Sequence, residues 1–352
     1  MERYQQAMTT GASNNGLHEM DDPNYFEWWY FDLVTTNGTT IVIDYHASTL
    51  GNRDKIPRFF VSIYPPNGQT IKRGATLEPN AVMVSKAKCD IQYLDNRIIE
   101  DKNRIAINWR ISDVTLDLTF EKQCPLLQLD DILLIEDPAT KRCFNWLVAA
   151  NRSKVRGSII TNNEKIDCSG VGYHDHNWGN LKLKDFISYW TWGRVLTDKH
   201  SIIFADIRER RNSIAGNLRP ILFENEGELV FRGSQYHSNK KQMSLQGPPA
   251  NIDLVTDISF GTTKGKITLC LDNFEQIDSI RFLYPDFENR FIRKWMISLY
   301  DLSRKNGLTF SLTDRLLRGT VYYRFMANCD LFQDQKHLSR GTALLEQMSF
   351  AS

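Results

Sequence analysis

The chain has 352 residues and a formal net charge of +1, and its composition is 41% hydrophobic, 24% charged and 11% aromatic. This length exceeds what one hydrophobic core ordinarily fills, so we expect two domains. The near-zero net charge gives no electrostatic footprint for nucleic acid or for an anionic membrane surface. No run of eighteen apolar residues is present, so we expect no membrane span and no stable membrane insertion.

Residues 1–22 are polar, contain Gly, Ser and Asn, and predict a flexible N-terminal arm. They lack the apolar run of a signal peptide. The six cysteines are scattered along the chain and form no Cys-x-x-Cys pair. This pattern is typical of reduced thiols in a cytoplasmic protein, and it predicts no structural zinc.

Short alternating apolar runs follow the arm at close intervals. In the first half we expect strands over these ranges: 41–46, 59–64, 104–111, 114–120, 145–150 and 158–160. In the second half we expect them around 187–195, 201–208, 218–223, 228–232, 266–271 and 320–330. Helix-like spacing of apolar residues appears at 286–302. Many short strands separated by turn signals predict an all-β protein of antiparallel barrels or sandwiches, with one or two short helices.

The chain repeats itself at an offset of 162 residues, which is the separation of Trp28 and Trp190. At the same offset Asp44 aligns with Asp206, without a gap between the two pairs. Each copy reads as aromatic-x-aromatic, a short apolar stretch, a polar turn and an apolar strand that carries an Asp.

The polar turns of the two copies are residues 36–38 and 198–200, and the first contains Asn-Gly, a strong hairpin signal. Such a repeat predicts two domains of similar plan, which we place at 23–186 and 187–352. Chance similarity of two aromatic hairpins is the alternative.

Residues 172–179 hold two His, one Asp, one Asn, one Tyr and one Trp between glycines. Side chains alternate along a strand, so one face would carry His174, His176 and Trp178. The other face would carry Tyr173, Asp175 and Asn177. So many titratable and hydrogen-bonding groups suit a functional site, although a satisfied buried polar network would account for them as well.

Residues 26–32 (FEWWYFD) and 172–179 (GYHDHNWG) resemble the two signatures of the hydroxyneurosporene synthase (carotenoid 1,2-hydratase) superfamily. Residues 190–194 (WTWGR) resemble the segment that follows the second signature. This superfamily includes lipocalin-like cyclases of natural-product biosynthesis, among them the fungal decalin-forming Diels–Alderases. The resemblance implies two tandem lipocalin-like β-domains, a hydrophobic pocket and no cofactor. It does not choose among hydration, cyclisation and cycloaddition.

Hydration or acid-initiated cyclisation of an isoprenoid requires an acid that protonates an alkene. Burial in an apolar pocket can keep a carboxyl group protonated near neutral pH. Asp206 ends the apolar run 202–206 and is the leading candidate, and the resemblance implies a functional acid on this strand. The alternative is a strand-end Asp that forms a salt bridge with Arg208 or Arg210.

Asp175 is the second candidate acid, with His174 or His176 as its proton partner. The two histidines also have the strand spacing of two metal ligands. No acidic ligand follows them closely in the sequence, so we expect no metal.

A pericyclic cyclase needs a pocket that folds a linear polyene into a reactive conformer. The candidate walls are aromatic: Trp28, Tyr30, Trp178, Trp190 and Trp192. Core packing is the alternative for them. Arg194 would share a strand face with Trp190 and Trp192. Its partner would be Asp32, Glu27 or a substrate carboxylate or carbonyl, or it would form a structural cation–π contact.

The sequence contains no glycine-rich phosphate loop and no Gly-x-Ser-x-Gly elbow. We therefore predict a cofactor-independent cyclase, of the isomerase or lyase kind, for a hydrophobic polyene or isoprenoid. Hydration of an isoprenoid double bond is the first alternative, and a non-catalytic carrier of a hydrophobic small molecule is the second. The oligomeric state is left open.

Overall fold

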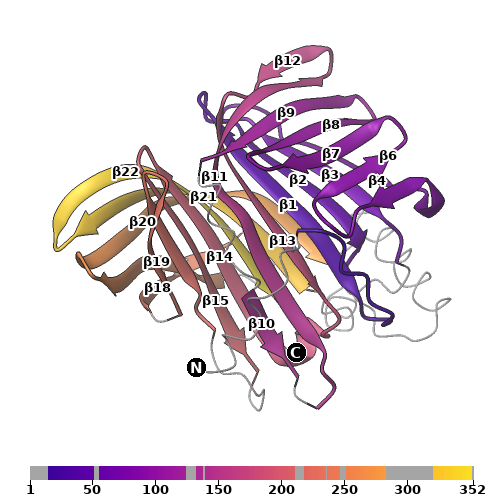
Figure 1. Cartoon of the computed structure of the whole chain (residues 1–352). Coiled ribbons are helices and arrows are strands. Elements are labelled where there is room, and N and C mark those ends of the chain that lie inside the picture. The colour runs from indigo at the N-terminus through magenta and orange to yellow at the C-terminus, as the bar shows by residue number, and fades with distance from the viewer. Residues whose placement is uncertain are drawn as a thin grey trace, which may run out of the picture. The chain divides into compact units, whose positions relative to one another are not determined.

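The computed structural model describes residues 15–50, 55–123, 132–137, 139–210, 218–234, 236–245, 251–282 and 320–350. Contacts divide the chain into two units, residues 1–181 and 182–352, and each is described by itself. The described part is almost entirely antiparallel strand, with the short helices η2 (Pro79–Ala81) and α1 (Leu183–Phe186) (Figure 1). The predicted all-β class is confirmed. The helix predicted at 286–302 lies outside the described residues.

The first unit is one sheet of thirteen strands. They are β1 (Phe26–Thr35), β2 (Thr40–Ser48), β3 (Arg58–Tyr64), β4 (Ile71–Thr76), β5 (Val82–Val84), β6 (Asp90–Tyr93), β7 (Asn96–Asp101), β8 (Arg104–Ile111), β9 (Val114–Lys122), β10 (Ile132–Glu136), β11 (Cys143–Thr161), β12 (Glu164–Asp167) and β13 (Gly170–Gly179). Their order is β4-β3-β2-β1-β13-β11-β9-β8-β7-β6-β5, and β10 and β12 pair with β11.

This first sheet curls around an apolar core. Phe59 on β3 and Trp109 on β8 are far apart in the strand order, yet their rings stack with centroids 4.2 Å apart. One core cluster accordingly joins residues from both arms of the sheet, such as Ile43 on β2 and Ile107 on β8. The alternating β-branched residues of these strands therefore close a barrel-like core, as a lipocalin-like domain requires.

The second unit is a sheet of nine strands. They are β14 (Ile187–Thr197), β15 (His200–Glu209), β16 (Ile221–Asn225), β17 (Glu228–Gly233), β18 (His237–Ser244), β19 (Asn251–Thr262), β20 (Gly265–Phe282), β21 (Thr320–Gln333) and β22 (Lys336–Ser349). Their order is β17-β16-β15-β14-β22-β21-β20-β19-β18. Among the described residues, no helix is both long enough and apolar enough to cross a membrane.

The two sheets share one plan when the short strands β5, β6, β10 and β12 are set aside. The remaining strands of the first unit then follow the same spatial order as β14 to β22 in the second. This agreement supports the internal repeat that the sequence predicts. The domain limits proposed from the sequence, 23–186 and 187–352, stay a prediction.

One detail of the repeat is wrong, because the two hairpins differ in length by one residue. Tyr30 pairs with Asp44 across β1 and β2, but its repeat partner Trp192 pairs with Ala205 across β14 and β15. Asp206 pairs with Thr191 instead. The second turn holds only residues 198–199, and His200, which the sequence placed in the turn, already begins β15.

This shift sends the two aligned acids to opposite faces of their sheets. Asp44 alternates with Ile43 and Tyr45, which belong to the first core. Asp206 shares a face with Phe204 and Ile202, which belong to the second core. A change of one residue in register exchanges the two faces of a strand, so Asp44 does not correspond to Asp206.

Residues 15–22 are packed against the first unit, which differs from the flexible arm that the composition predicts for residues 1–22. Asn15 is 2% exposed, and the backbone N–H of Leu17 donates to the carbonyl of Ser85 at 2.9 Å. His18 contacts Glu27 on β1. Polar side chains in this segment bond to buried groups of the sheet, and composition alone does not reveal such partners.

Candidate functional site

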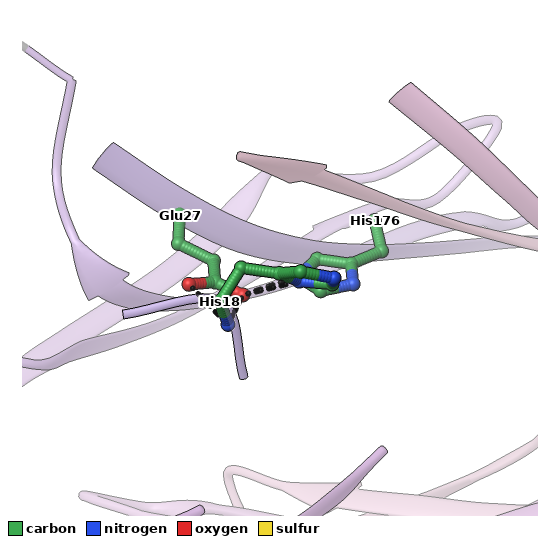
Figure 2. A group of neighbouring side chains, drawn as sticks. All are labelled: His18, Glu27 and His176. Carbon is green, nitrogen blue, oxygen red and sulfur yellow. Dashed lines mark hydrogen bonds and ion pairs between the residues drawn. The ribbon is translucent and has the colours of Figure 1, made fainter. Parts of the chain in front are cut away.

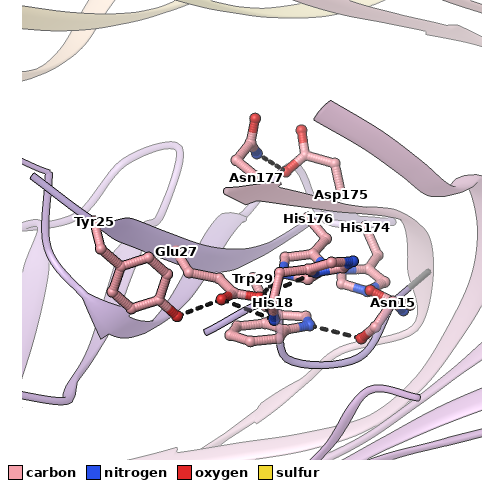
Figure 3. Close-up of polar contacts among 9 residues, drawn as sticks. All are labelled: Asn15, His18, Tyr25, Glu27, Trp29, His174, Asp175, His176 and Asn177. Atoms are coloured by element: carbon pink, nitrogen blue, oxygen red, sulfur yellow. Dashed lines mark hydrogen bonds and ion pairs between the residues drawn. The ribbon is translucent and has the colours of Figure 1, made fainter. Parts of the chain in front are cut away.

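The pairing of β1 with β13 places the two signature segments side by side. Trp29 pairs with His176 and Phe31 with His174, and each pair of rings stacks with centroids 4.0 Å apart. Trp29 and Phe31 belong to the first core. The predicted alternation of β13 is therefore confirmed, with the histidines on the core face and Asp175 on the other (Figure 3).

Glu27 is the centre of a polar cluster on the core face. Its side chain is fully buried, and its carboxylate accepts from the backbone N–H of His18 at 2.9 and 3.1 Å. His176 Nε2 lies 2.8 Å from Oε1, and the Tyr25 hydroxyl donates to Oε2 (Figure 3). Three residues thus converge on one buried acid.

These contacts decide the charge of the cluster. Burial favours the neutral acid, but hydrogen bonds from His176, His18 and Tyr25 outweigh it and lower the pKa of Glu27 to about 2. Burial and the neighbouring Glu27 raise the pKa of Tyr25 above its ordinary value, so this phenol stays a hydrogen-bond donor. Glu27 is therefore a carboxylate near neutral pH.

Aromatic rings hold the two histidines of this cluster in place. His18 stacks on Trp178 with centroids 3.9 Å apart and 7° between the planes. The His176 ring stacks on the Trp29 ring with 16° between the two ring planes. The ligand atoms of His18, Glu27 and His176 all lie within 4.8 Å of one another, so this group could hold a metal ion (Figure 2).

His174 belongs to a different network on the same face. Its Nδ1 donates to the carbonyl of Tyr30 at 2.9 Å, and its Nε2 accepts from the Asn15 amide at 3.0 Å. The same amide donates to Glu100, which forms an ion pair with Lys122. Burial lowers the pKa of His174 well below its usual value, so the ring is neutral. A ring with both nitrogens occupied is suited to a structural role.

Asp175 lies on the face opposite both neighbouring histidines, which argues against the predicted proton partnership. Its carboxylate accepts from Trp146 Nε1 at 2.8 Å and from the Tyr173 hydroxyl at 2.9 Å, both on Oδ2. The Asn177 amide donates to Oδ1 at 2.9 Å. The predicted partnership was inconsistent with the alternation of the strand, which points adjacent residues to opposite faces.

Aromatic side chains continue this second face of the first sheet. Tyr30 pairs in register with Asp175, and its ring meets Tyr173 edge-on at 6.1 Å. Trp28 stacks on His46 with centroids 6.1 Å apart. The candidate wall residues Trp28 and Tyr30 therefore share a face with Asp175, whereas Trp178 lies on the core face.

The second unit has a similar face. A Cβ on Gly193 would lie 2.3 Å from the Phe204 ring, so Gly193 faces the second core. Its neighbours Trp192 and Arg194 therefore point to the other side, together with Trp190. Trp192 is 8% exposed and Arg194 is 1% exposed.

An ion-pair network lies on the same face of the second unit. Glu346 pairs in register with Trp192, and it accepts from Arg324 Nε at 2.9 Å. Arg324 also donates to the Tyr322 hydroxyl at 2.7 Å and lies 3.8 Å from Asp278. Sequence reasoning missed this network because its members come from three separate strands, β20, β21 and β22.

Asp206 is buried on the core face of the second unit, away from Trp192 and Arg194. Lys240 Nζ lies 2.5 Å from Oδ2, and Arg219 Nε lies 3.4 Å from Oδ1. The two partners expected from the sequence lie elsewhere: Arg208 lies over the Tyr189 ring, and Arg210 donates to backbone carbonyls. Asp206 thus sits between two cations rather than alone in an apolar lumen.

The predicted site residues therefore fall into three places. The core face of the first unit holds His174, His176 and Trp178, the opposite face holds Trp28, Tyr30 and Asp175, and the second unit holds Trp190, Trp192, Arg194 and Asp206. Sequence reasoning missed Glu27 and His18. The first lies inside the 26–32 signature, but its approach to His176 follows only from the pairing of β1 with β13.

Parts of the chain are similar in sequence to known proteins. Residues 96–243 match the family described as carotenoid hydratase CrtC. Hydroxyneurosporene dehydrogenase of Chlorobaculum tepidum is 22% identical over 233 residues, which cover 56% of this chain and 60% of that protein. The quinolone epoxide rearrangement protein asqO of Emericella nidulans is 33% identical over 49 residues, 14% of this chain and 13% of that protein. The chain thus matches less than two thirds of the length of these curated relatives.

Solved structures resemble the chain over nearly its whole length. CghA in complex with Sch210972 has a TM-score of 0.64 at 8% identity, covering 97% of this chain and 96% of that one. Kievitone hydratase from Nectria haematococca has a TM-score of 0.57 at 12% identity, covering 98% and 93%. These likenesses show the fold, and the family match over residues 96–243 confirms the resemblance to the carotenoid 1,2-hydratase superfamily.

Proposed function

We propose that the protein is an enzyme of the hydratase and cyclase kind, and specifically a cofactor-independent cyclase for a hydrophobic polyene or isoprenoid. One observation carries the proposal. In each unit, the sheet face opposite the apolar core combines buried aromatic rings with hydrogen-bonded charged groups. Sites for hydrophobic small molecules have this composition, with apolar walls and a few placed polar groups.

The aromatic residues would bind the substrate through their ring faces. Trp28 and Tyr30 supply these faces in the first unit, and Trp190 and Trp192 supply them in the second. Arg194 would donate hydrogen bonds to a carbonyl or carboxylate of the substrate. Holding a linear polyene in a folded conformer brings its reacting carbons together and lowers the entropic part of the barrier.

The surroundings of the candidate acids favour cyclisation without alkene protonation. Asp175 accepts three hydrogen bonds from neutral donors, and Asp206 lies between Lys240 and Arg219. An acid that protonates an alkene must instead be held in its neutral form. The matching family region, 96–243, includes Asp206, and this supports hydration as the second candidate function.

Mass spectrometry of extracts from cells with and without the protein tests the proposal. A cyclase gives a product of the same mass as its precursor, a hydratase adds the mass of one water, and a carrier leaves the precursor unchanged. Asp206→Asn should lower conversion less than about threefold, whereas loss of a general acid costs about a hundredfold or more. A hundredfold loss in a folded Asp206→Asn variant would contradict the cyclase proposal and favour acid-initiated chemistry.

A further inference from the structure

Three ligand side chains converge from separate parts of the first unit: His18 before β1, Glu27 on β1 and His176 on β13. His18 Nδ1 lies 3.4 Å from Glu27 Oε1, and His176 Nε2 lies 2.8 Å from the same oxygen (Figure 2). We propose that these side chains bind a divalent first-row transition ion of the Zn²⁺ type. Through His18, the bound ion would link residues 15–22 to the first sheet.

The donor set has the chemistry that such an ion prefers. Two imidazole nitrogens and one carboxylate oxygen are borderline ligands that suit Zn²⁺ and its neighbours better than Ca²⁺ or Mg²⁺. Ligands about 2.1 Å from a common tetrahedral ion lie about 3.4 Å from one another. The separation of His18 from Glu27 already has this size. His176 would lose its hydrogen bond to Glu27 and move away by about half an ångström.

The groups around the ligands are arranged to orient them. Trp178 stacks on His18 and Trp29 stacks on His176, which fixes the planes of both imidazoles. The Tyr25 hydroxyl donates to Glu27 Oε2 and leaves Oε1 toward the histidines. Groups that orient metal ligands in this way commonly tune the affinity of a site.

The proposed ion also has a clear structural consequence. His18 belongs to the segment that precedes β1, whereas Glu27 and His176 belong to strands that pair with each other. The same segment is held by Trp29 Nε1, which donates to the carbonyl of Asn15 at 3.1 Å. A metal shared by His18 and the sheet would therefore lower the freedom of residues 15–22.

The proposed metal site is separate from the proposed substrate contacts. The three ligands lie on the core face of β1 and β13, whereas the proposed substrate contacts Tyr30 and Trp28 lie on the opposite face. Metal binding and conversion of substrate can therefore be measured separately, and failure of one leaves the other standing.

The test uses the full chain without a polyhistidine tag, stripped with a chelator and then titrated with ZnCl₂ or CoCl₂. We expect one Zn²⁺ per chain, and at about a hundredfold excess over the dissociation constant the unfolding temperature should rise by about 5–10 °C. Hydrogen exchange at residues 15–22 should slow on addition of Zn²⁺. Co²⁺ should give visible absorption bands from nitrogen and oxygen coordination.

His18→Ala is the main variant, because the His18 side chain is 27% exposed and its loss should leave the fold intact. It should weaken Zn²⁺ binding at least tenfold and abolish the slowing of exchange. His337→Ala, a half-exposed histidine of the second unit paired with Asp330, is the matched control and should behave as the wild type. Glu27→Gln keeps the shape of the acid and should also weaken binding.

Two results would overturn the proposal. One is Zn²⁺ binding of equal affinity to the wild type and His18→Ala, which would place the ion elsewhere. The other is the absence of stoichiometric binding to the wild type when circular dichroism shows a folded chain.

Discussion

The two units arrange their strands in the same order but stabilise buried acids in different ways. Asp175 pairs with Tyr30 across β1 and β13, and Glu346 pairs with Trp192, the repeat partner of Tyr30, across β14 and β22. These two acids thus occupy corresponding positions. Asp175 is held by neutral donors, whereas Glu346 is held by the guanidinium of Arg324.

A shared topology therefore does not determine the electrostatics of a site. Backbone pairing decides where a side chain can stand, and the side chains on neighbouring strands decide its charge environment. The first unit surrounds Glu27 and Asp175 with histidines and neutral donors, whereas the second surrounds Asp206 and Glu346 with lysine and arginine. The two units should therefore respond differently to loss of a partner, to acid and to changes in the aromatic faces.

The largest expected effect is loss of the cation beside Glu346. Arg324→Met should destabilise the second unit by about 3–5 kcal/mol, because it leaves Glu346 and Asp278 buried without this cation. Asp175→Asn keeps an acceptor oxygen for Trp146 and Tyr173 and loses only the bond from Asn177, so it should cost about 1–3 kcal/mol in the first unit. Urea unfolding followed by hydrogen exchange in each unit measures both, and an equal cost would remove the distinction between the units.

The second largest expected effect is a loss of stability of the first unit in acid. Burial, together with Arg58, lowers the pKa of His46 to about 3, and burial lowers the pKa of His174 as well. The folded unit keeps these rings neutral, whereas the unfolded chain binds protons below pH 6.5, so this stability is complete above pH 6.5 and falls as the pH drops. At pH 4.5 the contribution of His46 alone is a loss of about 3 kcal/mol.

The lowered pKa of Glu27 adds a further loss at lower pH. Its contribution is present above about pH 4.5 and disappears as the pH falls toward 2. Hydrogen exchange at pH 7 and at pH 4.5 should show the first unit opening before the second. In His46→Phe the acid-dependent loss should shrink, and an unchanged pH profile in this variant would contradict the assignment.

The aromatic faces give the third test. Trp192→Ala should lower the rate of conversion about tenfold by loosening the folded conformer of the substrate, which corresponds to about 1.4 kcal/mol. Tyr30→Ala, at the corresponding position of the first unit, measures in the same way the contribution of that unit's aromatic face. A rate loss in one variant alone would assign the substrate to one unit, and no loss in either would refute both faces.

The smallest effect concerns the two hairpin turns. Gly38 has a φ of +87°, and a Cβ there would make only ordinary contact with Pro66 at 3.7 Å. Gly38→Ala should therefore cost about 1 kcal/mol through the backbone alone. Lys199→Ala, in the shorter turn of the second unit, removes only an exposed ion pair with Glu226 and should leave the unfolding temperature unchanged. Thermal unfolding of both variants checks this difference.

Much of the architecture could be predicted from the sequence. Alternation along residues 172–179 correctly separated His176 from Asp175, and the repeat of Trp28 and Trp190 correctly indicated two sheets of one plan. The alternation is a local feature, because the geometry of an extended backbone alone alternates its side chains.

The candidate site depended on the tertiary structure. The contact of His18 with Glu27, and of Glu27 with His176, required the packing of residues 15–22 on the sheet and the pairing of β1 with β13. The ion pairs of Asp206 with Arg219 and Lys240 join β15 to residues beyond the repeated hairpin.

The face of Asp206 was decided by the turn that precedes β15, which is one residue shorter than its counterpart in the first unit. The sequence shows that neighbouring residues of a strand point apart. Which of the two faces meets the core depends on register, and register is set by turn length and by the strands that pair across the sheet.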